Sequence, residues 1–69
     1  MRLQPEDCYL LWSEQVVKLR ERLDQSRWMA VIWDHAAFQW SPAVYAIDEH
    51  LIEAAVPDPQ QCLGQRNTG

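Results

Sequence analysis

The most apolar stretch of the chain, residues 27–40, limits its possible folds more than any other feature. It reads R-W-M-A-V-I-W-D-H-A-A-F-Q-W and holds three of the four tryptophans. Apolar side chains recur along it at steps of three, one, three, one and three, the period of one helical face: Met29, Ile32, Trp33, Ala36, Ala37 and Trp40. This spacing predicts a helix over residues 27–40.

The same stretch can also be interpreted as a strand. Residues 28–33 form an unbroken apolar run with β-branched and aromatic members, and such a run is ambiguous by periodicity alone. A buried strand of about 4–8 residues should meet a turn signal by Asp34 or Ala36. Because no glycine or proline interrupts the pattern, its length favours the helix, and the strand stays open as the alternative.

Residues 5–25 carry a second apolar pattern with helical spacing. Pro5 suits the first position of a helix, and the two acids after it favour the positive end of the helix dipole. Apolar residues then follow at steps of three or four: Tyr9, Trp12, Val16, Leu19 and Leu23. We expect a helix over 5–25 and a turn at the polar residues 24–27, with Ser26 as the next helix cap. One continuous helix through both segments is the alternative, since no glycine or proline separates them.

A third helix is expected over residues 42–56. The residue before a proline avoids helical angles, so Ser41 ends the preceding helix, and Pro42 then fits the first helical position. Its expected buried stripe is Val44, Ile47, Leu51 and Ala55. Two prolines end it, and residues 57–69 are expected to form a flexible tail. The sequence thus predicts an all-α domain over residues 1–56, a three-helix antiparallel bundle or a helical hairpin with a short third helix.

The small size of the chain predicts that its core needs a supplement. A chain of 69 residues buries only about 60% of its unfolded surface. Cys8 and Cys62 are poorly placed for a disulfide, so dimerisation is expected to complete the core. The N-terminal residues carry a proline and acids where a signal peptide would be apolar, and no apolar run approaches the about 20 residues of a membrane span. We expect a cytoplasmic protein.

Candidate metal and catalytic residues lack the spacing that such sites require. Structural zinc sites usually bring their ligands in close pairs, whereas the four candidates are isolated in the sequence: Cys8, His35, His50 and Cys62. The chain has no nucleophile-elbow pattern and no glycine-rich phosphate loop. We therefore expect no enzymatic activity, no metal and no cofactor.

The surplus of aromatic residues is the strongest functional signal. Tryptophan and tyrosine are enriched at protein interfaces, so we expect an intracellular protein–protein interaction module. The candidate interaction residues are Trp28, Phe38, Tyr45, Asp48, Glu49 and Glu53. One alternative is a small acidic inhibitor or regulator that places these carboxylates in a basic site of its target. A helical-hairpin nucleic-acid binder using the bases of residues 18–27 is less favoured, because the net charge is −4.

Overall fold

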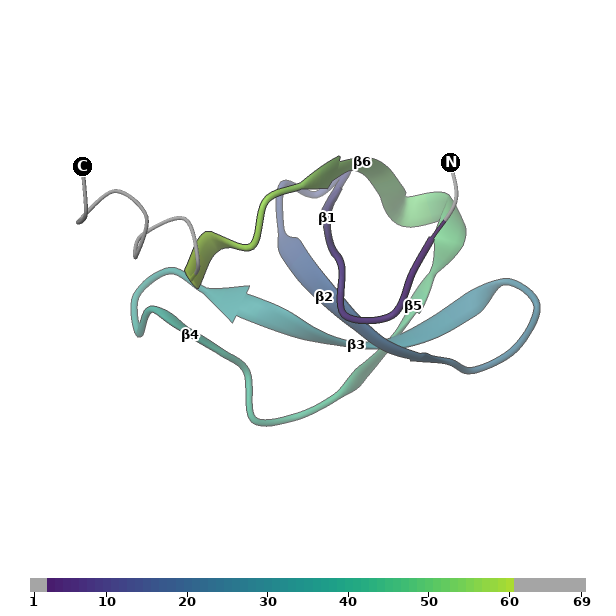
Figure 1. The fold of residues 1–69 in the computed structure, drawn as a ribbon, viewed down its shortest axis with the longest axis horizontal. Coiled ribbons are helices and arrows are strands. Elements are labelled where there is room, and N and C mark those ends of the chain that lie inside the picture. The colour runs from purple at the N-terminus through teal and green to yellow at the C-terminus, as the bar shows by residue number, and fades with distance from the viewer. Residues whose placement is uncertain (1–2, 61–69) are drawn as a thin grey trace.

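The computed structural model describes residues 3–60, and most of these form a strongly twisted antiparallel β-sheet (Figure 1). The strands and the single 3-10 turn follow one another in the order β1 (Cys8–Leu11), β2 (Val16–Arg22), β3 (Arg27–Asp34), β4 (Gln39–Trp40), β5 (Tyr45–Asp48), η1 (Glu49–Leu51) and β6 (Ile52–Val56). The spatial order is β4-β3-β2-β1-β6, and β5 also pairs with β3. The last strand therefore returns to lie beside the first.

Two short strands share the outer edge of β3. Strand β5 pairs with its first half and β4 pairs with its last two residues, Trp33 and Asp34. At the opposite side of the sheet, β6 pairs antiparallel with β1 in a register that places Tyr9 opposite Ala55. These long-range pairings, which local sequence does not show, decide the architecture.

The hydrophobic core lies on one face of the curled sheet. Its buried members sit at alternate positions of their strands, as the period of two in a β-strand requires: Tyr9, Leu11, Val17, Leu19, Trp28, Ala30 and Ile47. Leu3, Ile32 and Ile52 are partly buried against this cluster. The core is therefore built by alternation within short strands.

The predicted all-α fold is wrong, and so are the helical bundle and the helical hairpin. Residues 3–58 contain no α-helix, and each of the three expected helices is replaced by two strands, with η1 lying between the last pair. The strand interpretation of residues 28–33 is the correct one, because β3 covers them. Both faces of β3 are covered, with Trp28 buried on one side and Val31 and Trp33 on the other. A strand buried on both faces gives the continuous apolar run that resembled a helix.

A small aromatic cluster covers the second face of β3. The ring of Trp33 makes edge contacts with Trp40, at 5.2 Å between centroids, and with Phe38, at 6.0 Å. The ammonium of Lys18 lies 5.2 Å from the centre of a Trp40 ring. Trp33 and Trp40, which the helical spacing placed on one helical face, thus help to bury this face of one strand, and Phe38 packs beside them.

The turns show why the helix signals misled. Pro5 lies in a turn in which the Asp7 N–H donates to the Gln4 carbonyl at 3.4 Å, and Glu6 has a φ of 72°. This is the geometry of a type II turn with proline at its second position. The Asp34 carboxylate accepts hydrogen bonds from the N–H groups of Ala36 and Ala37 and so ends β3. Proline and aspartate both act here as turn residues.

The start of the predicted tail is held against the sheet. The Asp58 carboxylate forms an ion pair with Lys18 at 2.9 Å, and both side chains are largely buried. The rest of that tail, residues 61–69 with Cys62, lies outside the described residues, so its flexibility stays a prediction.

Candidate protein-binding site

Trp12 is the most exposed of the large apolar side chains that the structure describes, at 66%. Leu51 is 48% exposed, and the backbone brings these two residues together. The N–H of Trp12 donates to the carbonyl oxygen of Leu51 at 2.9 Å, and the next pair along β1 and β6 is Leu11 with Ile52. We call the exposed side chains of Trp12 and Leu51 the Trp12–Leu51 surface.

A tight turn between β1 and β2 presents Trp12. The Glu14 N–H donates to the Leu11 carbonyl at 2.8 Å, and the Leu11 N–H donates to the Gln15 carbonyl at 2.8 Å. Glu14 has a φ of 72°, in the left-handed region that normally favours glycine. This combination is a type I turn followed by a left-handed residue, a common three-residue hairpin loop. Both backbone hydrogen bonds fix the position of Trp12.

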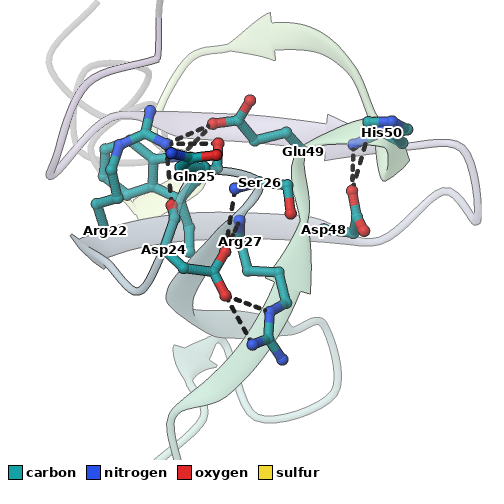
Figure 2. Close-up of polar contacts among 9 residues, drawn as sticks. Arg22, Asp24, Gln25, Ser26, Arg27, Asp48, Glu49 and His50 are labelled. Atoms are coloured by element: carbon teal, nitrogen blue, oxygen red, sulfur yellow. Dashed lines mark hydrogen bonds and ion pairs between the residues drawn. The ribbon is translucent and has the colours of Figure 1, made fainter.

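The η1 turn, which presents Leu51, is held by a polar network (Figure 2). Glu49 Oε1 accepts a hydrogen bond from Trp28 Nε1 at 3.1 Å and forms an ion pair with Arg22 Nη1 at 2.9 Å. The Arg22 guanidinium stacks over the Trp28 ring at 4.7 Å. In addition, the Glu49 N–H donates to the Ser26 carbonyl at 2.8 Å. This network attaches η1 to the turn between β2 and β3.

The turn between β2 and β3 is itself ordered by charged side chains. The Asp24 carboxylate accepts hydrogen bonds from the N–H groups of Ser26 and Arg27, and it pairs with the Arg27 guanidinium at 2.6 Å (Figure 2). The hydrogen bond from the Arg27 side chain, followed by that from the Ser26 backbone, holds the pKa of Asp24 below its usual value. Arg22 Nη1 donates to the carbonyls of Asp24 and Gln25 at 3.1 Å each. The turn between β2 and β3 therefore supports η1.

The charge around the Trp12–Leu51 surface is negative. Glu14 follows Trp12 in the same turn, while Glu53 lies two residues beyond Leu51, at a bulge of β6 that leaves it without a partner on β1. Asp48 caps η1 by accepting the His50 N–H at 2.9 Å. Within residues 3–60, each of the four lysine and arginine side chains forms an ion pair with an acid of this chain: Lys18–Asp58, Arg20–Glu6, Arg22–Glu49 and Arg27–Asp24. His50 Nδ1 in η1 lies 3.1 Å from the Asp48 carboxylate. Glu14 and Glu53 take part in none of these pairs.

The structure places three of the six predicted interaction residues away from the Trp12–Leu51 surface. Trp28 is 4% exposed and belongs to the core, where it meets Glu49. Phe38 is exposed but lies against Trp33 on the opposite face of β3. Tyr45 is exposed on β5 opposite Ala30.

Sequence reasoning placed three acids near the site, with Glu49 at the start of η1, but missed the centre of the site. Asp48 directly precedes η1 and Glu53 follows it, so both lie close along the chain to Leu51. Helical spacing instead predicts that Trp12 and Leu51 lie on the buried stripes of two helices. The polar residues Ser13, Glu14 and Gln15, directly after Trp12, are the signal of a turn that would have exposed it.

A cleft away from the Trp12–Leu51 surface contains a thiol that is not activated. The cleft, of about 500 Å³, is lined by Glu6, Asp7, Cys8, Lys18, Ala55, Val56, Pro57 and Asp58. Burial, and then the nearby Asp58 carboxylate, raise the pKa of the Cys8 thiol to about 11. Cys8 is therefore protonated near neutral pH and is a poor nucleophile. Across residues 3–60, no group of three histidine, cysteine or acidic side chains could hold a metal ion.

Comparisons with protein-family models, curated proteins and solved structures found no match. No helix in the described part of the chain is long and apolar enough to cross a membrane. The function is therefore inferred from the geometry and charge of the chain itself.

Proposed function

We propose that this chain is a non-catalytic protein-binding domain that holds a basic segment of another protein against the Trp12–Leu51 surface. The observation that carries the proposal is the indole of Trp12, 66% exposed on a turn fixed by backbone hydrogen bonds. An aromatic side chain presented rigidly loses little conformational freedom on binding. Tryptophan is also enriched among the residues that dominate interface energies, where truncation costs about 2 kcal/mol or more.

The charge of the surrounding residues indicates the chemistry of the partner. Glu14 lies two residues after Trp12 and Glu53 two residues after Leu51, and neither carboxylate forms an ion pair with another described residue. A partner segment with a leucine or an aromatic residue flanked by lysine or arginine would cover Trp12 and Leu51 and complement these carboxylates. Such complementarity raises the association rate and rejects acidic segments.

The second candidate function is an acidic inhibitor or regulator that inserts carboxylates into a basic site. The exposed Glu53 and the acids of the η1 region support it. In this second candidate the carboxylates supply most of the binding free energy, so the affinity should fall steeply as salt is added. In the first candidate burial of Trp12 supplies most of it, and that contribution does not weaken steeply with salt. Nucleic-acid binding is less supported, because the four bases on which it depended all form ion pairs within the domain.

The free, buried thiol of Cys8 supports a cytoplasmic location, which stays part of the proposal. Cysteines remain reduced in that compartment.

Synthetic peptides test the proposal directly. The first peptide has one leucine or tryptophan flanked by lysines, and the second has the same apolar residue flanked by glutamates. The third has alanine flanked by lysines. Calorimetry should show the tightest binding for the first, and Trp12→Ala should weaken it about 30-fold, the equivalent of about 2 kcal/mol. Phe38→Ala is the matched control, because Phe38 is also exposed, at 59%, but lies elsewhere. Equal binding by basic and acidic peptides, or equal losses in the two variants, would overturn the proposal.

A further inference from the structure

We propose that β5 pairs edge to edge with β5 of a second copy of this chain, so that one antiparallel sheet runs through a symmetric dimer. The inference is independent of the Trp12–Leu51 surface. It rests on the chemistry of the β5 edge and on the direction of its backbone groups.

Strand β5 is the least protected edge in the described part of the sheet. It pairs with β3 on one side only. Asp48, the last residue of β5, is its one charged residue, and residues 43–47 read A-V-Y-A-I between Pro42 and this aspartate. Val44 and Tyr45 are each 47% exposed. Natural edges are usually blunted by charges, prolines or bulges, and an exposed apolar edge without them is a template for another strand.

The other exposed edge has those protections. Strand β6 carries Glu53 at a bulge, and Pro57 follows its last residue. Strand β4 has only two residues, Gln39 and Trp40. Addition of a strand is therefore expected at β5 rather than at β6 or β4.

The hydrogen bonds of β3 and β5 show which backbone groups point outward. The Glu49 N–H donates to the Ser26 carbonyl, and this pair continues the β3–β5 register by one step beyond Asp48 and Arg27. Bonded and non-bonded pairs alternate in an antiparallel ladder. The backbone groups of Ala46 and Asp48 therefore point away from β3. No hydrogen bond to the N–H or carbonyl of Ala46 from outside the ladder occurs among residues 3–60.

A two-fold axis at Ala46 makes this edge complementary to itself. Ala46 then pairs with Ala46 of the second copy, and Val44 lies opposite Asp48, so that no like charges meet. Tyr45 and Ile47 become cross-strand neighbours, an aromatic and β-branched pair that stabilises sheets. Symmetric pairing of identical surfaces is the commonest form of homodimer.

The small core of this chain favours a second copy, rather than an unrelated strand, as the partner of β5. Among residues 3–60, ten apolar residues are buried, and only one of them, Ile47, comes from β5. A second β5 would cover the exposed side of Tyr45 and continue the short ladder. Domains of this size usually need such extra burial.

Charge reversal at Ala46 tests the dimer and its register. The unmodified protein should sediment at micromolar concentrations at about 16 kDa, twice its 8.1 kDa mass. Ala46→Lys and Ala46→Glu should each raise the dimer dissociation constant at least tenfold, because like charges would face each other across the axis. An equimolar mixture of the two should dimerise again. Ala55→Lys, at an exposed alanine on the β6 edge, should leave the dimer unchanged.

Disulfide trapping gives a second measurement that does not require charged variants to fold. In a background of Cys8→Ala and Cys62→Ala, Ala46→Cys should cross-link between copies on mild oxidation, because the Cα atoms of directly opposed residues in a bonded pair lie about 5.5 Å apart, within the range that a disulfide spans. Ala55→Cys should not. A monomer at all concentrations up to millimolar, a dimer that persists in Ala46→Lys, or loss of the dimer only in Ala55→Lys would overturn the inference. Trp12→Ala should not affect dimerisation, and Ala46→Lys should not affect peptide binding, so that the two proposals fail separately.

Discussion

The indole N–H of Trp28 donates a hydrogen bond to the Glu49 carboxylate at 3.1 Å and so joins the start of β3 to the η1 turn, 21 positions later in the chain. The same carboxylate oxygen forms the ion pair with Arg22. Leu51, half of the Trp12–Leu51 surface, is presented by the turn that this contact holds. The Glu49 carboxylate therefore connects the hydrophobic core, through Trp28, to the η1 turn that presents Leu51.

Glu49→Ala should lower the free energy of unfolding by about 1–3 kcal/mol, because it leaves the Trp28 N–H without its acceptor and the Arg22 guanidinium without its anionic partner. Glu49→Gln keeps an acceptor for Trp28 and should lose less. Urea unfolding followed by circular dichroism measures both. The control is Glu53→Ala, a change at an exposed acid outside the network that should stay within about 0.5 kcal/mol. Equal effects of Glu49→Ala and Glu53→Ala would show that the network contributes nothing to stability.

Truncation of Trp28 should reduce stability strongly, whereas truncation of Trp12 should hardly change it. Trp28→Ala empties a position that is 4% exposed and should cost about 3–5 kcal/mol, most or all of the stability of so small a domain. Trp12→Ala should change stability by less than about 0.5 kcal/mol, because its side chain is exposed. Thermal melting of both variants measures the difference. Similar melting temperatures for the two would contradict the placement of Trp28 inside and Trp12 outside.

Glu14→Gly should raise the free energy of unfolding by up to about 1 kcal/mol. Glu14 has a φ of 72°, which costs a side chain about 1–2 kcal/mol, and glycine removes that cost while adding about 0.5–1 kcal/mol of backbone entropy to the unfolded chain. The matched control is Gln15→Gly in the same turn, a position without a positive φ, which should lower stability. Chemical denaturation of both variants measures the sign. A loss at Glu14 as large as that at Gln15 would contradict the turn geometry.

The Cys8 thiol should make stability fall at alkaline pH. Its pKa is raised from 9.0 to about 11 in the folded protein, chiefly by burial, so the unfolded chain loses this proton first. The stabilising contribution is complete below about pH 9 and is lost as the pH rises toward about 11. Urea unfolding across this range should show a steeper decline for the unmodified protein than for Cys8→Ala. Cys62→Ala should retain the steep decline, and a parallel decline in Cys8→Ala would exclude Cys8 as its cause.

Local turn chemistry could be predicted from the sequence. The polar residues 24–27 and the Ser41-Pro42 step do interrupt regular structure where expected, because their signals act over a few residues. At the first, the Asp24 carboxylate binds backbone N–H groups directly after it. Asp34 performs the same task for β3, but an aspartate without a neighbouring glycine or proline is a weaker turn signal, so the sequence pattern does not predict where this strand ends.

By itself, the sequence determined which segments are apolar, where two chain reversals fall and that the residues around Leu51 are acidic. Only the tertiary structure decided that those segments are strands. A run of four to eight apolar residues fits the period of a helix as well as that of a strand, and only the contacts on its second face distinguish the two. The tertiary structure also decided that Trp28 is buried and Trp12 exposed. Trp12 meets Leu51 only because β6 returns to pair with β1, and a contact between residues 39 positions apart leaves no trace in local periodicity.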